Sequence, residues 1–369
     1  MVNKTGIEGK KFSRIMGIAV FYAGFFAITP AFSAKIDPIL QKYNLTAEHI
    51  EPLEIKIGTL APTGTPWIDF VYEKLIPYVN AESRGKIKIV LYAGGVMGED
   101  TDILRKMKLG QLQGCGCTVL GVLLSSPEVS VLSLPMLFNN YKEVDYILET
   151  FRDDIDKMFD KRGYYLAGLI DTGFFYLFAK NEIKALDDLK KQKVLTWFGE
   201  VETTTLDELG VKPISVTVPE VVTSLQTGLI NADIAPPTWQ MGTQAYTQTN
   251  YYVTQPFIYS IAAIILDKAN IEKIAAKYPK GLGDDMVKLA TSLIRDLEGE
   301  WRNRIRDYEE KSLRAFKNSG MRPVTLSSED LANLQNVAPR VWKRLEGKLY
   351  SKELLNKILS ALEQYRSKK

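Results

Sequence analysis

Few residues of this chain could carry bond-making chemistry, and its two cysteines are the first to consider. Cys115 and Cys117 stand two residues apart in the sequence Gly-Cys-Gly-Cys. In an extended chain both side chains point to one face, and this spacing is too tight for an unstrained disulfide. A metal site needs more ligands than this segment offers. We therefore expect two buried thiols on a strand, with a strained short-loop disulfide as the alternative.

The supply of general bases is equally small. The chain has a single histidine, His49, in a linker-like segment before the folded body. Most hydrolase triads and most zinc sites need a histidine inside the fold. The acidic pairs at 153–154 and 187–188 are typical of helix starts rather than of paired catalytic carboxylates. No glycine-rich motif has the spacing of a phosphate-binding loop. We expect no enzyme, no metal and no cofactor.

The elements that must position any binding site follow from apolar periodicity. From residue 54 onward, strands and helices are predicted to alternate, which is typical of an α/β fold with a largely parallel sheet. The main predicted strands are 54–58, 87–92, 129–134, 164–169, 174–179 and 258–266, and the main predicted helices are 67–81, 100–109, 141–161, 286–316 and 327–369, the last with a break near Pro339.

Two loops of this alternation are candidate ligand contacts. The segments 61–67 and 94–99 follow the first two predicted strands and are rich in glycine, proline or threonine. In open α/β sheets, ligands bind outside the carboxyl ends of the strands. Both loops are expected at that edge of the sheet.

The first 33 residues have the pattern of a secretory signal. Basic residues ending at Arg14 precede an apolar run at 15–28, and small residues stand before a cleavage point after Ser33. A run of about 14 residues is shorter than the roughly 20 needed to span a bilayer. We predict cleavage after Ser33, with Ala34 as the second choice and an uncleaved anchor as the alternative, and therefore a periplasmic protein exported by a cleavable signal peptide.

Outside this leader the chain is electrically neutral. The leader holds four of the 47 basic residues and one of the 44 acidic residues, which accounts for the formal net charge of +3. A neutral body offers no electrostatic footprint for nucleic acid or for an anionic membrane surface. We expect neither as a partner.

Short motifs spread over most of the chain, from about residue 54 to 342, point to one family. The most telling is Leu-Gly-Val-Lys-Pro-Ile at 209–214, followed by the helix-like 219–228. The others lie at 57–62, 94–99, 109–112, 134–138 and 186–190. Together they resemble the extracytoplasmic solute receptors of tripartite ATP-independent periplasmic (TRAP) transporters, DctP type.

The resemblance implies a two-lobed periplasmic binding protein fold with interleaved lobes, hinge strands and a long bracing helix. Such a receptor would capture a small molecule between its lobes and deliver it to the small and large membrane subunits of the transporter. A protein of the same fold that serves a sensor or another carrier is the alternative. The expected divisions are a signal peptide at 1–33, a spacer at 34–53, lobe I at 54–172 and 261–300, lobe II at 173–260 and 301–345, and a C-terminal helix at 346–369.

Three departures from the family pattern suggest the class of ligand. The family usually holds a carboxylate with arginines at positions that fall on Leu195 and Phe175 here, and an asparagine position falls on Ala235. A buried carboxylate without a cationic partner costs several kcal/mol, and an arginine fork is the usual remedy. We therefore predict an apolar or amphipathic ligand.

Aromatic residues near these positions would add apolar contact area. An ordinary core role for them and a displaced carboxylate anchor are the alternatives; in the latter case Arg105, Lys106 or Lys108 would supply the cation. The predicted ligand-binding residues are Trp67, Met97, Phe174, Phe175, Leu195, Trp197, Ala235 and Trp239, with Phe198 close by in the sequence.

Overall fold

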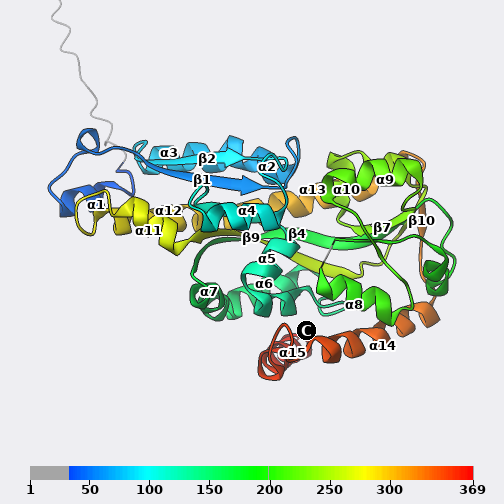
Figure 1. Ribbon diagram of the computed structural model, residues 1–369. Helices are drawn as coiled ribbons and strands as arrows, with labels where there is room; N and C mark the ends of the chain where they lie inside the picture. Colours follow the sequence, from blue (N-terminus) through cyan, green and yellow to red (C-terminus); the bar gives the residue numbers. More distant parts are fainter. Residues whose placement is uncertain (1–32, 198, 369) are drawn as a thin grey trace, which may run out of the picture. The chain divides into compact units, whose positions relative to one another are not determined.

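One long strand, β4 (Tyr164–Ala179), organises the fold (Figure 1). The computed structural model describes residues 33–197 and 199–368, so residues 1–32 of the expected signal peptide and Phe198 lie outside the described residues. Nearly every residue of β4 is buried, as in a strand that is covered on both faces. The two strands predicted at 164–169 and 174–179 are therefore one strand, interrupted by register shifts rather than by a loop.

The first half of the sheet consists of β1, β2 and β3 together with β9 and most of β4. Here β1 pairs in parallel with β2 and β3, whereas β9 is antiparallel to both β3 and β4. The strands are β1 Leu53–Thr59, β2 Ile87–Tyr92, β3 Gly114–Cys117 and β9 Ile258–Asp267.

The second half of the sheet is built on the last residues of β4, where β7 and β8 pair with it antiparallel and β10 pairs with β8 in parallel. The expectation of a largely parallel sheet is thus wrong. The chain passes from the first half of the sheet to the second along β4 and returns along β9. Because β4 and β9 are neighbours in the sheet, they are antiparallel. These strands are β7 Ala232–Ala235, β8 Tyr251–Val253 and β10 Arg322–Val324, and a separate parallel pair is β5 Leu195–Thr196 and β6 Ile214–Ser215.

Helices follow the strands in the first half, largely as predicted. The expected helix 67–81 contains a π-helical turn, and the expected helix 141–161 is divided at Phe151. The elements are α1 Asp37–Lys42, η1 Ala47–His49, α2 Pro66–Phe70, η2 Val71–Leu75, α3 Ile76–Glu82, α4 Asp100–Lys108, α5 Val119–Ser125, α6 Tyr141–Thr150 and α7 Arg152–Lys161.

One predicted strand in this region is wrong. Residues 129–134 lie in and beside the 3-10 helix η3 (Pro127–Ser133). Pro127 stands at its first position, where the fixed φ of proline favours a helical turn. The apolar run is buried, and burial alone does not distinguish a strand from a short helix.

The helices of the second half and of the connection back to the first half are short. Gly228 ends α9 in the left-handed conformation that favours glycine, as its position in the sequence predicts. The short helices of this region are η4 Leu186–Lys191, α8 Glu200–Glu208, η5 Val218–Glu220, α9 Val221–Thr227, α10 Pro237–Gly242, η6 Ala245–Gln248 and α11 Lys268–Ala275.

The predicted long helix at 286–316 is two helices, α12 (Leu282–Asp296) and α13 (Glu298–Asn318), which meet at Leu297. Both pack on β4, and α13 also contacts α2 in the first half and α10 in the second. The pair therefore braces both halves of the sheet, as Figure 1 shows.

The C-terminal helices break elsewhere than predicted. Pro339 lies inside α14 (Ser328–Leu345), and α15 (Lys352–Ser367) follows after a turn that contains Gly347 with φ of +80°. Pro339 stands on the exposed side of α14. Proline has no N–H group to donate to the backbone carbonyl one turn earlier, and at an exposed position water can donate to that carbonyl instead. Among the described helices, none is long and apolar enough to cross a membrane.

Candidate ligand-binding site

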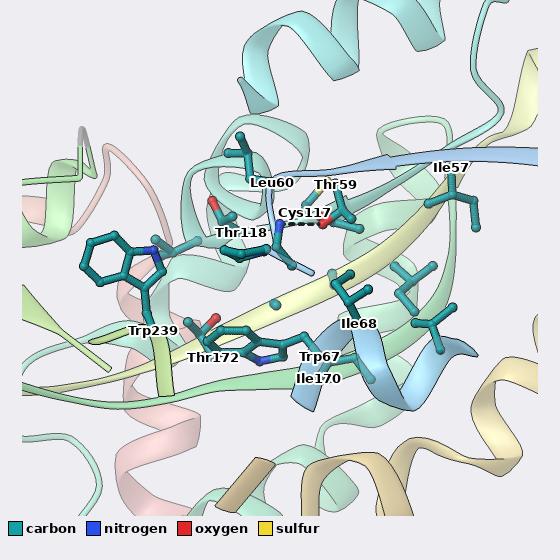
Figure 2. A pocket seen from close by; sticks show the side chains of 18 of the residues that line it. Ile57, Thr59, Leu60, Trp67, Ile68, Cys117, Thr118, Ile170, Thr172 and Trp239 are labelled. Carbon is teal, nitrogen blue, oxygen red and sulfur yellow. Dashed lines mark hydrogen bonds between the residues drawn. The ribbon is translucent and has the colours of Figure 1, made fainter. Parts of the chain in front are cut away.

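A cavity of about 150 Å³ lies against the middle of β4 (Figure 2). Most of its wall comes from the first half of the sheet: strands β1, β3 and β9, the loop after β1, and helix α2. The second half contributes Trp197, Val218, Pro236 and Trp239. Side chains from segments far apart in the sequence therefore meet around one space.

Tryptophan dominates this wall. Four of the five tryptophans of the chain line the cavity. The rings of Trp197 and Trp239 meet edge to face, with centroids 5.0 Å apart and planes at 81°. Trp301 stacks on Phe70 with centroids 5.1 Å apart. Aromatic walls of this kind offer large apolar contact area with little rotamer freedom to lose.

The four indole N–H groups fall into two classes. Trp67 donates to the backbone oxygen of Asp171 at 3.0 Å, and Trp197 donates to that of Ile234 at 2.7 Å. The Nε1 atoms of Trp239 and Trp301 are buried, and among the described residues neither has a hydrogen-bond partner. Native structures leave few buried donors unpaired.

The cavity wall has almost no charge. Of the described residues that line it, Glu99 alone is charged, and none is lysine, arginine or histidine. Burial raises the pKa of Glu99, and a hydrogen bond from the backbone N–H of Val218 opposes that shift. A second carboxylate in this cavity would meet no cation and one acidic side chain.

Hydroxyl groups supply the remaining side-chain polarity. The hydroxyl of Thr59 donates to the backbone oxygen of Gly116 at 2.7 Å, and that of Thr118 donates to the buried carboxylate of Asp100. The hydroxyl of Thr172 is buried without a partner among the described residues. Thr172 and Trp239 therefore both bring unpaired polar atoms to the wall.

Cys117, a residue of this wall, forms a disulfide with Cys115, so the expectation of two buried thiols is wrong. Their Cα atoms are 5.2 Å apart, inside the range that a disulfide bridges, even though both lie on β3. Among the described residues, the two cysteines and Asp100 bring their potential metal-ligand atoms within 4.8 Å of one another. Metals bind the thiolate, and a disulfide has none. Burial raises the pKa of Asp100 to about 6.

A bulge in β4 decides which side chains reach the cavity. Asp171 pairs with Ile261 and Gly173 with Ser260, so Thr172 is an extra residue on β4. Side chains alternate along a strand, and one extra residue exchanges the faces beyond it. Phe175 therefore lies on the cavity side, and Phe174 lies on the opposite side.

The opposite face of β4 carries a matched ionic cluster. Asp171 is fully buried and accepts hydrogen bonds from Arg306 Nε at 2.6 Å and from the hydroxyl of Tyr259 at 2.6 Å. The other two nitrogens of the Arg306 guanidinium donate to the carboxylate of Asp145, each at 2.7 Å. This arginine is thus fully engaged by two carboxylates.

The predicted ligand-binding residues separate into two groups. The structure brings Trp67, Phe175, Trp197 and Trp239 to the cavity wall. It buries the side chains of Phe174, Leu195 and Ala235 outside that wall and leaves Met97 partly buried on its loop. Leu195 stands two positions before the wall residue Trp197, and Ala235 stands one position before the wall residue Pro236. Contact of any of these residues with a ligand stays a prediction.

Sequence reasoning missed several wall residues, among them Trp301 and Thr172. Trp301 belongs to the apolar side of the bracing helix, where a core role was expected. Thr172 reaches the wall through the bulge, and the available signal was the neighbouring glycine, Gly173, which adopts φ of +111°. Glu99 lies in the loop 94–99, which the sequence offers as a candidate ligand contact, and it forms a capping box with Asp102 at the start of α4.

Known proteins match this chain over most of its length. The profile of the bacterial extracellular solute-binding protein family 7, DctP, covers residues 57–348. The uncharacterized protein YiiZ of Salmonella typhimurium is 28% identical over 158 residues, which cover 42% of this chain and 48% of that protein. This chain thus spans about half the length of that relative. The C4-dicarboxylate-binding periplasmic protein DctP of Rhodobacter capsulatus is 23% identical over 279 residues, or 73% of this chain and 79% of that protein.

Solved structures share the fold. The sugar acid binding protein DctPAm of Advenella mimigardefordensis, in complex with galactonate, superimposes with a TM-score of 0.76 at 20% identity and covers 85% of this chain and 99% of that chain. Other proteins with this two-lobed α/β fold are TRAP periplasmic solute binding proteins. Because the family profile covers well over half of the chain, the protein belongs to family 7 of the bacterial extracellular solute-binding proteins, the DctP family, whose members are substrate-binding receptors of transporters rather than enzymes.

Proposed function

We propose that this protein is the periplasmic receptor of a TRAP-type transporter for an apolar or amphipathic small molecule. The receptor is exported by the leader at 1–33, binds its ligand in the tryptophan-lined cavity, and delivers it to the small and large membrane subunits. The lobes expected from the sequence, joined along β4 and β9, close on the ligand. The observation that carries the proposal is the absence of any cation among the described residues of the cavity wall.

The chemistry of the wall supports this class of ligand. Two of the proteins named above, DctP of Rhodobacter capsulatus and DctPAm, are named for or solved with C4-dicarboxylates and galactonate, which are acids. An acid that is removed from water needs a cationic, hydrogen-bonding partner. On the far face of β4, Arg306 already satisfies Asp171 and Asp145. Phe175 stands where the sequence resemblance expects a ligand-binding arginine.

The size of the cavity sets a second limit. Apolar cavities of about 150 Å³ stay dry and take up molecules of the size of benzene. The cavity here has this volume and is lined mainly by aliphatic and aromatic side chains. Burial of apolar surface contributes about 25 cal/mol per Å², so one enclosed ring is enough for measurable affinity. A single ring with a small substituent fits both limits.

Mass spectrometry of the small molecule that co-purifies with the protein from its native periplasm tests the proposal. We expect an uncharged or amphipathic compound at near-stoichiometric amount. A small dicarboxylate or sugar acid would overturn the ligand class and would mean that a cation outside the described wall reaches the ligand.

The variant Phe175→Arg provides a second test, with Phe175→Leu as the apolar control. The added guanidinium would fill part of the cavity and place a buried cation in its apolar wall, so we expect the affinity for the co-purifying molecule to fall by about tenfold or more. Phe175→Leu should retain most of that affinity. Equal effects of the two variants in isothermal titration would contradict an uncharged ligand.

A further inference from the structure

We infer that the cavity recognises a ligand that is apolar except for one neutral hydrogen-bond acceptor, a carbonyl oxygen. The indole N–H of Trp239 and the hydroxyl of Thr172 donate to that oxygen. This inference rests on the proposed function and adds the polar group that the ligand must carry.

The first observation is the contrast among the indoles of the wall. Trp67 and Trp197 donate to backbone oxygens, and their rings serve as apolar surface only. Trp239 and Trp301 are 7% and 4% exposed, and the Nε1 atom of neither has a partner among the described residues; Trp239 is the one of this pair that comes from the second half of the sheet. An unpaired buried donor costs free energy in the empty protein, and a ligand oxygen that accepts from it removes that cost.

The second observation is the hydroxyl of Thr172. It is buried and unpaired, and it lines the same cavity as Trp239. In Figure 2 the indole nitrogen of Trp239 and the hydroxyl oxygen of Thr172 are both drawn on the sides of these residues that face the middle of the pocket. Because Thr172 is the extra residue of the β4 bulge, its position depends on that bulge. A carbonyl oxygen has two lone pairs and accepts from two such donors.

The third observation is the charge of the wall, which selects a neutral acceptor over a carboxylate. Among the described residues of the wall, Glu99 is the charged one and none is cationic. A carboxylate would accept from Trp239 and Thr172 but would remain an uncompensated buried charge beside Glu99. A ketone, aldehyde, ester or amide oxygen accepts the same bonds without that cost.

A pair of isosteric probes tests the inference on the full-length protein. Acetophenone carries a carbonyl oxygen, and α-methylstyrene carries a methylene group in its place. Isothermal titration or tryptophan fluorescence gives both dissociation constants. We expect acetophenone to bind roughly tenfold more tightly than α-methylstyrene.

Two substitutions assign this preference to Trp239. In Trp239→Phe the N–H donor is lost together with part of the ring area, so both affinities should fall and their ratio should fall close to one. In the control Trp197→Phe the lost donor was already bonded to Ile234, so both affinities should fall together and the ratio should persist. Thr172→Val should lower the ratio without lowering the affinity for α-methylstyrene. A ratio that Trp239→Phe leaves unchanged would overturn the inference.

The remaining outcomes separate this inference from the proposed function. Equal binding of the two probes to the native protein would overturn the carbonyl acceptor and leave the apolar cavity standing. Tighter binding of phenyltrimethylammonium than of acetophenone would also overturn it, because the indole faces and Glu99 would then recognise a cation. If neither neutral probe binds and galactonate does, the proposed ligand class itself fails.

Discussion

Around Asp171, the polar groups on one face of β4 are hydrogen-bonded to one another, and polar groups on the other face are unpaired. On the face with Asp171, an arginine, two carboxylates and a tyrosine hydroxyl satisfy one another. On the cavity face, Thr172 and Trp239 keep unpaired polar atoms in an apolar wall. A fully hydrogen-bonded cluster stabilises a fixed arrangement, whereas unpaired donors in a cavity can form hydrogen bonds with a ligand. The ionic cluster and the cavity wall thus share one strand and differ in which polar groups are hydrogen-bonded.

The largest effect is expected from breaking the matched face. Arg306→Met leaves the buried carboxylate of Asp171 without its hydrogen-bonded cation and leaves Asp145 with the longer contact to Arg302 at 3.8 Å, and removal of one partner of a buried pair costs about 3–5 kcal/mol. The free energy of unfolding in urea measures this loss. Arg314→Met is the control, because Arg314 is 59% exposed and pairs only with the exposed Glu310 at 3.2 Å.

We expect Arg314→Met to change the free energy of unfolding by no more than about 1 kcal/mol. A similar small loss in Arg306→Met would mean that water reaches the cluster and that the two faces of β4 differ less than their contacts suggest.

Neighbouring phenylalanines test the exchange of faces at the bulge. Phe174 packs edge to face against Tyr141 and Tyr259, so Phe174→Ala should cost about 3 kcal/mol or more of stability and leave the binding of toluene to the folded protein unchanged. Phe175→Ala should weaken toluene binding by about tenfold, because Phe175 lines the cavity. Chemical denaturation and titration separate the two effects. Loss of toluene binding in Phe174→Ala alone would show that the faces are assigned in the wrong order.

This pair also shows where sequence reasoning succeeds. The strand at 87–92 and the helix beginning at Asp100 are confirmed, because local apolar alternation and a capping box determine them. Phe174 and Phe175 could not be distinguished in that way. Their faces depend on one extra residue in the pairing of β4 with β9, and the two strands are about 90 residues apart in the sequence.

The missed tryptophan has a similar cause. Trp301 fits the apolar stripe of α13 equally well as core or as cavity wall. The distinction arises only when α13 packs beside α2 and β4. Periodicity identifies a buried side chain and does not say whether protein or ligand will cover it.

Gly173 sharpens the comparison with a smaller effect. Its φ is +111°, and a Cβ atom there would lie 2.6 Å from the carboxylate of Glu309. Gly173→Ala therefore combines backbone strain with a displaced buried carboxylate, and we expect a loss of about 2–3 kcal/mol in the free energy of unfolding. Gly163→Ala is the control, because Gly163 has φ of +83° and open space around its Cβ position.

The control should lose only the strain, about 1 kcal/mol. Equal losses in the two variants would mean that the backbone conformation matters at Gly173 and that contact with Glu309 does not.

A further effect, small for each pH unit, is a pH dependence from the same face of β4. Burial raises the pKa of Glu309 to about 8, although the hydroxyl of Tyr141 and the backbone N–H of Phe174 donate to its carboxylate. The folded protein therefore holds this proton more tightly than the unfolded chain does. The stability it contributes is complete below about pH 4.5 and is lost as the pH rises toward 8, with a slope of at most about 1.4 kcal/mol per pH unit.

Urea unfolding between pH 5 and 8 measures this slope, and Glu309→Gln should reduce it, since the amide does not titrate. Burial also raises the pKa values of Glu202 and Asp233 to about 8, so part of the slope should remain in the variant. Glu310→Gln, at the exposed neighbouring position, should leave the slope unchanged. Stability that rises from pH 5 to 8 in the native protein would contradict a protonated Glu309. It would place an ionised carboxylate beside Asp171 and make this face of β4 more highly charged than its hydrogen bonds indicate.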